Sequence, residues 1–134
     1  MDKREKGRQF EDYIAKLLSE RGWVVHKARR VAKQIRDIKT GRVFWVSVKT
    51  DIFGAFDGIA CHKEKDFIIF YQATLHPAIE KRIRKIEKIP LPNSCLAIIF
   101  QKKDREIRIL DKTGKEIGRI KRRNFYYLDS NPIF

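Results

Sequence analysis

The feature that most constrains this chain is an uninterrupted apolar run at residues 67–71, Phe-Ile-Ile-Phe-Tyr, followed by Gln72, Ala73 and Thr74. A strand without polar positions is normally covered on both faces, which places it in the centre of a sheet. Because strand side chains alternate, Gln72 and Thr74 point to one face where the apolar run ends. The run therefore predicts a layered fold with polar groups at the end of its central strand.

Helices and further strands are predicted on both sides of this run. Apolar residues recur at helical spacing from Phe10 to Leu18, ahead of Gly22, which suits a helix C-terminus. A second helix is expected after Pro77, which fits a first helical turn. Strands are expected at residues 23–28, 35–38, 43–48, 56–61, 94–101, 106–111 and 116–119. The order predicts one α/β or α+β domain with a mixed central sheet. Its core covers residues 6–101, and a C-terminal hairpin and a basic, aromatic tail cover residues 102–134.

The charge of the chain points to a polyanionic partner. Lysine and arginine outnumber aspartate and glutamate by 31 to 17, which gives a net charge of +14. Nucleic acid is the commonest partner of so basic a small domain, because binding releases condensed counterions. A charged surface is also typical of thermophile proteins, which is the alternative explanation. DNA is the expected partner and RNA a further alternative, with recognition through backbone and shape because no base-reading motif is visible.

Several other classes are not expected. No stretch approaches the roughly 20 apolar residues that span a bilayer. Residues 1–9 are charged and lack a hydrophobic signal region, so a cytoplasmic location is expected. Cys61 and Cys95 lie in apolar runs and are interpreted as reduced core residues, and with the three histidines they show no zinc-site spacing.

Basic residues gather in three clusters. The first, interpreted as a connection after the strand at 23–28, contains Arg29, Arg30, Lys33 and Arg36. The second, on the helix after Pro77, contains Lys81, Arg82, Arg84, Lys85 and Lys88. The third contains Arg119, Lys121, Arg122 and Arg123, and the aromatic residues 125–127 follow it. Such clusters would follow a phosphate backbone. The aromatic residues are expected to pack in the core or at an interface rather than to stack on bases.

Three polar positions are candidates for chemistry. Glu11 lies roughly 100° from Phe10 and about 20° from Leu18 on a helical wheel, on the flank of the apolar face. Asp57 lies between apolar residues in the segment DIFGAFDGIA, where a carboxylate must be paired, solvated or bound to a cation. Gln72 emerges at the end of the central strand. The three together indicate a site that could hold a divalent cation, such as Mg²⁺ or Mn²⁺, on oxygen ligands.

The segments KGRQFE, DIFGAFDGIA and FIIFYQAT, followed by a basic helix, resemble the PD-(D/E)xK nuclease superfamily. The resemblance covers residues 6–88 and is greatest to the small archaeal and phage relatives of Holliday-junction resolvases and VRR-type nucleases. It implies a restriction-endonuclease-like core and Mg²⁺-dependent cleavage of duplex or branched DNA. It also implies metal ligands at Glu11, Asp57 and Gln72, and it puts Thr74 where the family has its lysine.

Two departures from the family pattern leave alternatives open. Gln at the acidic position occurs in the VRR-type branch, but Thr74 cannot supply a positive charge, and Lys49, Lys81, Arg82 or Lys85 would have to reach the site instead. A second register, with Asp37, Ser47 and Lys49 in the three motif positions, keeps the lysine but loses a ligand, so we prefer the register with Asp57 and Gln72. The alternative to an enzyme is a DNA-binding accessory protein that has the same core without catalysis. A homodimer is a further expectation, because cutting both strands of a duplex needs two sites.

Overall fold

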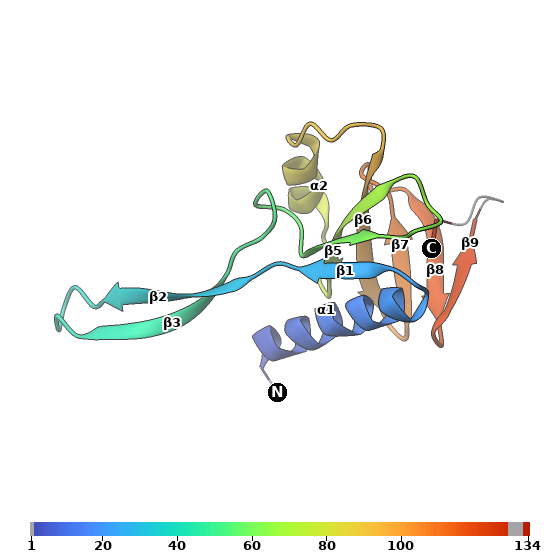
Figure 1. The fold of residues 1–134 in the computed structure, drawn as a ribbon. Helices are drawn as coiled ribbons and strands as arrows, with labels where there is room; N and C mark the ends of the chain where they lie inside the picture. Colours follow the sequence, from blue (N-terminus) through green and yellow to red (C-terminus); the bar gives the residue numbers. More distant parts are fainter. Residues whose placement is uncertain (1, 129–132) are drawn as a thin grey trace.

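The computed structural model describes residues 2–128 and 133–134. In chain order its elements are α1 (Lys3–Glu20), β1 (Val24–Lys27), β2 (Arg30–Arg36), β3 (Val43–Lys49), β4 (Gly58–Cys61), β5 (Ile68–Thr74), α2 (Glu80–Glu87), β6 (Cys95–Lys103), β7 (Glu106–Leu110), β8 (Glu116–Lys121) and β9 (Asn124–Tyr127). Figure 1 shows a twisted sheet with one helix on each side and a long two-stranded arm. Neither helix in the described part of the chain is long and apolar enough to cross a membrane.

The main sheet has seven strands in the order β1-β4-β5-β6-β7-β8-β9. Only β5 and β6 pair in parallel, and α2 lies in the connection between them. Residues of β5 pack alternately into two apolar clusters, one under α1 and one under α2. The mixed α/β class and the central, doubly covered position of the apolar run are confirmed. The restriction-endonuclease-like core stays a prediction.

Helix α1 forms because its ends are capped and one face is apolar. The Asp2 side chain accepts a hydrogen bond from the Glu5 backbone N–H at 2.8 Å, and Gly22 takes a left-handed φ of 92° just after the helix. The buried residues of its apolar face are Phe10, Ile14, Leu17 and Leu18. Burying each such side chain contributes roughly 1.5–3 kcal/mol, so this face fixes the helix across the sheet.

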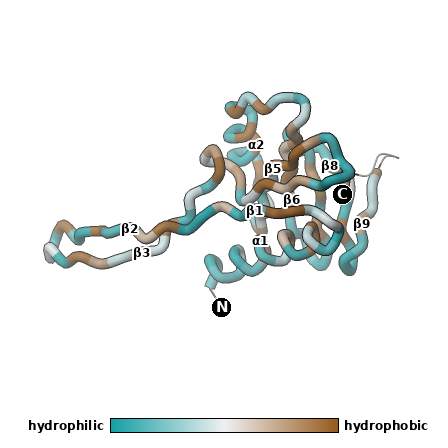
Figure 2. Tube along the Cα trace, in the orientation of Figure 1, coloured by the Kyte–Doolittle hydropathy of each residue, from teal (hydrophilic) through white to brown (hydrophobic). Residues whose placement is uncertain are grey.

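Strands β2 and β3 form a separate two-stranded sheet that projects from the body as an arm (Figure 1). The hairpin predicted from strands at 35–38 and 43–48 is present, with a tight turn at Gly41. The basic stretch before it was predicted to be a connection, which was wrong, because its first strand begins at Arg30 and pairs with β3 along its whole length. Alternation gives the arm two unlike faces, and Figure 2 shows apolar and polar positions side by side along it. One face carries Val31, Ile35, Phe44, Val46 and Val48, together with Lys33. The other carries Arg30, Arg36, Trp45 and Lys49.

The C-terminal strands continue the main sheet. The strands predicted at 106–111 and 116–119 are present as β7 and β8, and β9 was not predicted. Ile107, Ile109 and Ile120 from these strands are buried in the cluster under α1. Strands β7 to β9 therefore pack in the same cluster as buried residues of the range 10–100, and the predicted division of the single domain stays a prediction. Their apolar faces complete the core.

Candidate active site

Two carboxylates that sequence analysis singled out meet at one lysine. Lys49 Nζ donates a hydrogen bond to Glu11 Oε1 at 2.5 Å and a second, short one to Asp57 Oδ1. The three residues come from α1, from the end of the arm and from the segment that enters β4. The side chains of Glu11, Lys49 and Asp57 are 21%, 19% and 7% exposed. A largely desolvated cluster therefore joins residues that are far apart in the chain.

The backbone around Asp57 fixes its carboxylate. Its N–H donates to the Tyr71 carbonyl at 2.8 Å, and its carbonyl accepts from the Ala28 N–H at 2.7 Å. Its second carboxylate oxygen accepts from the Ala73 N–H at 2.7 Å. The residue is thus held between β5 and the end of β1, with one carboxylate oxygen turned toward Lys49. These hydrogen bonds offset the cost of burying a charged group.

Gly58 makes room for this arrangement. A Cβ built at Gly58 would lie 2.5 Å from the Tyr71 hydroxyl, so the ring of Tyr71 lies directly against the glycine backbone. The two residues face each other across the β4–β5 pair. The glycine is therefore needed for close approach rather than for an unusual φ.

The charge states of the cluster depend on one another. Burial and the neighbouring Asp57 carboxylate raise the pKa of Glu11, against the lowering effect of Lys49. Burial lowers the pKa of Lys49, but its hydrogen bonds to Asp57 and Glu11 outweigh this and raise the pKa above its ordinary value. Lys49 is therefore an ammonium at neutral pH, and Glu11 is the carboxylate that takes up a proton more readily than usual.

Two further residues belong to the surroundings of this cluster, and sequence analysis missed both. Asp51 Oδ1 lies 3.6 Å from Lys49 Nζ. The Tyr71 hydroxyl is buried and has no hydrogen-bond partner among the described residues, and its pKa is raised by burial and by the charges of Asp57 and Glu11. The signal for Tyr71 was its place in an apolar run, where a phenol needs a hydrogen-bond partner.

Gln72 and Thr74 are not brought into this cluster. Alternation along β5 directs Tyr71 and Ala73 toward α1, and it directs Phe70, Gln72 and Thr74 toward α2. The Gln72 side-chain carbonyl oxygen is buried without a hydrogen-bond partner among the described residues. Thr74 Oγ1 accepts from the His76 N–H at 3.0 Å.

The lysine beside the two carboxylates is instead Lys49, one of the alternatives that the sequence left open. The second register, with Asp37, Ser47 and Lys49, fails as a unit. Asp37 lies in the arm turn, where it forms hydrogen bonds with Lys39 and Arg42.

The donor set is a partial fit for a divalent cation. Glu11 and Asp57 are hard oxygen ligands, which Mg²⁺ and Mn²⁺ prefer. Among the residues that the structure describes, no three or more His, Cys, Asp or Glu side chains are grouped so as to hold one metal ion. The ammonium of Lys49 stands where a cation shared by the two carboxylates would lie. A metal ion would therefore have two protein ligands here only after Lys49 withdraws.

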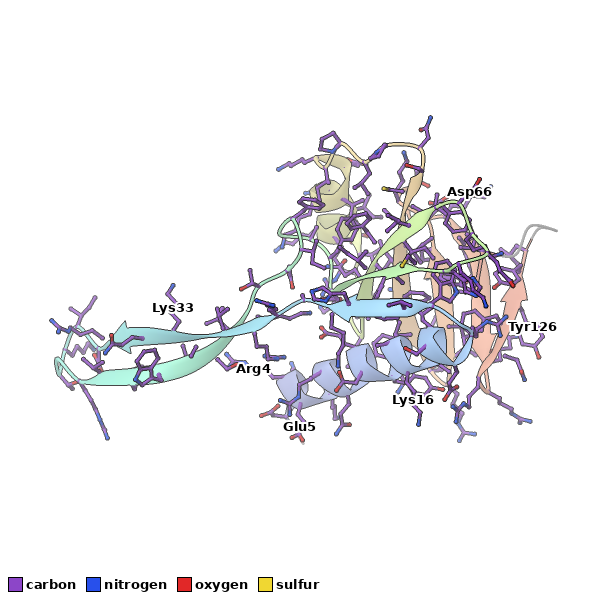
Figure 3. All side chains as sticks on the ribbon, in the orientation of Figure 1. Arg4, Glu5, Lys16, Lys33, Asp66 and Tyr126 are labelled. Atoms are coloured by element: carbon purple, nitrogen blue, oxygen red, sulfur yellow. The ribbon has the colours of Figure 1, made fainter. Side chains whose placement is uncertain are left out.

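The basic residues expected to bind nucleic acid lie on two different parts of the molecule. Arg29, Arg30, Lys33 and Arg36 lie at the base and along the first strand of the arm, and Figure 3 shows Lys33 projecting from it. Arg30 is close enough to Glu11 to affect its charge state. Lys81, Arg82 and Lys85 lie on α2, on the face of the sheet opposite α1. The arm is thus the basic surface continuous with the carboxylate cluster.

No family model, curated protein or solved structure matches this chain.

Proposed function

We propose that this protein binds DNA and hydrolyses its phosphodiester bonds at the cluster of Glu11, Lys49 and Asp57, with Mg²⁺ or Mn²⁺ as cofactor. The observation that carries the proposal is the meeting of a buried and a partly buried carboxylate with an ammonium beside a strongly basic arm. Ionisable groups whose pKa values are shifted by burial and by specific charged neighbours, as for Glu11 and Lys49, cluster at binding and catalytic sites. The resemblance to PD-(D/E)xK nucleases supports the same reaction class.

Each residue of the cluster has a role in this proposal. Glu11 and Asp57 would hold the metal ion, which would polarise a phosphoryl oxygen and lower the pKa of a bound water. Lys49, freed from its two carboxylates, neutralises charge on the phosphate, which Thr74 cannot do. The Tyr71 hydroxyl is buried with a proton to donate and no described acceptor, so it would hold an internal water beside the cluster rather than contact the substrate.

DNA is the substrate class that the charge distribution favours. Residues 29–49 contain seven Lys or Arg and one Asp, and Lys49 at their end belongs to the carboxylate cluster. A two-stranded ribbon has the width to enter the major groove of a duplex. The arm would therefore hold a duplex or branched DNA with its backbone close to the cluster.

One observation favours a second function, DNA binding without catalysis. Lys49 already donates hydrogen bonds to both carboxylates and offsets one of their two negative charges, so a cation occupies the position between them without a metal ion. In that case the ammonium has replaced the catalytic cation, and the protein acts through its basic surface alone.

Cleavage assays separate the two functions. Supercoiled plasmid, a flap and a four-way junction are incubated with Mg²⁺ or Mn²⁺ and with wild-type protein, Asp57→Asn or Asp66→Asn. Asp66 is exposed in the β4–β5 turn, so Asp66→Asn is a matched control for the loss of one carboxylate. Cleavage by wild type and the control but not by Asp57→Asn, with DNA affinity retained, supports the nuclease. Tight binding without metal-dependent cleavage by wild type contradicts it and leaves the binding function. Competition between duplex DNA and RNA at one salt concentration tests the choice of nucleic acid.

A further inference from the structure

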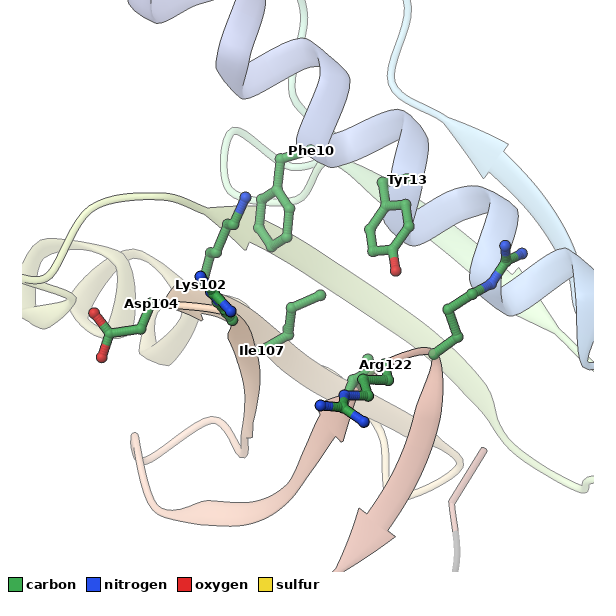
Figure 4. Close-up of a pocket in the computed structure, with 9 residues that line it drawn as sticks. Phe10, Tyr13, Lys102, Asp104, Ile107 and Arg122 are labelled. Atoms are coloured by element: carbon green, nitrogen blue, oxygen red, sulfur yellow. The ribbon is translucent and has the colours of Figure 1, made fainter.

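A groove lies on the flank of α1 away from the carboxylate cluster. One part of it, with a volume of about 330 Å³, lies between α1, strands β6 to β8 and the β6–β7 and β8–β9 turns (Figure 4). It is lined by Phe10, Tyr13, Lys102, Asp104, Arg105, Ile107, Ile120, Arg122 and Arg123. A second hollow of about 430 Å³ shares three of these residues and adds Lys6, Gln9 and Leu75. The two form one groove along the helix.

Helix geometry separates this groove from the site proposed above. At about 100° per residue, Tyr13 lies about 160° from Glu11 around α1, with the buried apolar face between them. Glu11 faces the arm and β4, whereas Tyr13 faces the turns at the opposite flank. The groove is therefore a second location and not an extension of the Glu11–Lys49–Asp57 cluster.

The groove is strongly cationic. Its lining contains Lys6, Lys102, Arg105, Arg122 and Arg123, against one acidic residue, Asp104. Arg123 pairs with Glu20. No hydrogen bond or ion pair engages the side chains of the other four cations among the residues described. Cations crowded together without acidic partners repel one another, so an anionic ligand would relieve them.

Backbone conformation adds to the case for Arg122. The β8–β9 turn has two central residues, Arg122 and Arg123, with φ values of 50° and 71°. Turns of this kind strongly prefer Asn or Gly, because other residues are strained at positive φ. Folding alone would therefore favour Asn-Gly here. Two arginines in this turn lower stability, but they place guanidinium groups at the groove.

The floor of the groove is apolar and partly aromatic. Phe10, Ile107 and Ile120 are almost fully buried, while Tyr13 beside them is 38% exposed. Figure 4 shows both rings reaching from α1 toward the sheet. An exposed aromatic ring above an apolar floor, edged by cations, suits a flat base with a phosphate attached.

We propose that this groove binds a nucleoside phosphate unit, with the base against Tyr13 and the phosphate among Arg122, Arg105 and Lys102. The unit is either a free nucleotide or one nucleotide of a single strand. This site does not require the carboxylate cluster. It gives a role to Arg122, Arg105 and Lys102, which the proposed nuclease site leaves unused.

Arg122→Gly is the informative variant, because glycine accepts positive φ and removes the cation. Its control is Lys112→Gly, which removes one charge in the β7–β8 turn at the other end of these strands. Fluorescence anisotropy with labelled dT12 at fixed salt is expected to show about tenfold weaker binding for Arg122→Gly than for the control. Thermal melting is expected to show that Arg122→Gly is at least as stable as wild type, so weaker binding will not reflect unfolding. Equal affinities of the two variants would overturn the proposal.

Base stacking is tested separately. Tyr13→Phe should bind dT12 like wild type, whereas Tyr13→Ala should bind about tenfold more weakly. An abasic 12-mer should bind wild type about as weakly as dT12 binds Tyr13→Ala. Equal affinity for abasic and normal strands would overturn the proposal, because only charge would then be recognised.

Two last measurements locate the ligand and its source. A dT12 carrying 5-iododeoxyuridine is irradiated in the complex, and the crosslink is expected in the peptide of residues 9–16, which contains Tyr13. Crosslinks confined to the arm would overturn the proposal. Competition by dTMP identifies a free-nucleotide site, and its failure to compete identifies a path for a strand. The dT12 measurements use no divalent metal ion and no cleavage readout, so this proposal and the nuclease proposal fail independently.

Discussion

Lys49 Nζ donates a hydrogen bond to Glu11 Oε1 at 2.5 Å, which ties the base of the projecting arm to the middle of helix α1. The same ammonium binds Asp57, so one cation holds together the helix, the arm and the segment that enters β4 of the main sheet. This relationship gives the cluster a structural role that is independent of catalysis, and both roles can be measured.

Replacing the lysine should expose two repelling carboxylates. Lys49→Met is expected to lower the free energy of unfolding by about 1–3 kcal/mol, less than for a fully buried pair because the cluster is partly exposed. Added Mg²⁺ or Mn²⁺ should restore part of this stability in the variant, because the position between Glu11 and Asp57 is then open to a divalent cation. Urea denaturation with and without metal measures both effects. If Mg²⁺ and Mn²⁺ leave the free energy of unfolding of Lys49→Met unchanged, Glu11 and Asp57 do not form a cation site.

The raised pKa of Glu11 predicts a pH dependence of stability. Above its ordinary value of 4.5, the unfolded chain loses the Glu11 proton before the folded protein does. This carboxyl group therefore lowers stability as the pH rises from 4.5 through its raised pKa. Glu11→Gln removes the effect, so the variant's stability relative to wild type should increase between pH 4 and pH 7. Denaturation curves across this range measure the difference, and a difference that is constant or falls would show that the sign is wrong.

The close approach of Gly58 to Tyr71 predicts a strong effect of one methyl group. Gly58→Ala places a Cβ 2.5 Å from a buried ring and should cost about 1–3 kcal/mol of stability through overpacking. Gly7→Ala is the matched control, since nothing lies within 4 Å of its added Cβ and alanine favours the helix. Thermal denaturation should therefore rank Gly7→Ala above wild type and Gly58→Ala below it. Equal melting temperatures of the two variants would contradict the packing described here.

The two basic surfaces should contribute unequally to DNA binding. Lys33→Gln with Arg36→Gln removes two charges from the arm, and Lys81→Gln with Lys85→Gln removes two from α2. Binding to duplex DNA weakens with salt, and the slope of log K against log salt concentration measures how many phosphates the protein neutralises. If the arm follows the DNA backbone, the first pair of substitutions should make this slope shallower by about 0.9 for each phosphate that the arm no longer neutralises. The second pair should change this slope less. Affinities measured from low to moderate salt give the slopes, and a larger change for the α2 pair would move the interface to that helix.

The part of the candidate site that could be predicted from the sequence was its two carboxylates, because each stands among apolar residues of its own segment of the chain. Glu11 stands on the flank of an apolar helical face, and Asp57 stands between apolar residues before a strand. Both patterns are local, so the sequence alone was sufficient to select them. Gln72 was selected for its place at the strand end, but alternation turned it toward α2. Tyr71 on the other face was overlooked because it belongs to the apolar run.

By itself, the sequence determined the central strand, the apolar face of α1, the basic character of the chain and the two carboxylates of the cluster. These depend on side-chain periodicity and on composition, which need no knowledge of distant contacts. Only the tertiary structure decided that Lys49 completes the cluster. The full pairing of β2 with β3 places Lys49 at the base of the arm, opposite Arg30, and the chain then turns so that Asp57 lies beside the Lys49 ammonium. It also decided that the turn at Arg122 faces Tyr13, since residues so far apart in the chain become neighbours only through the order of strands in the sheet.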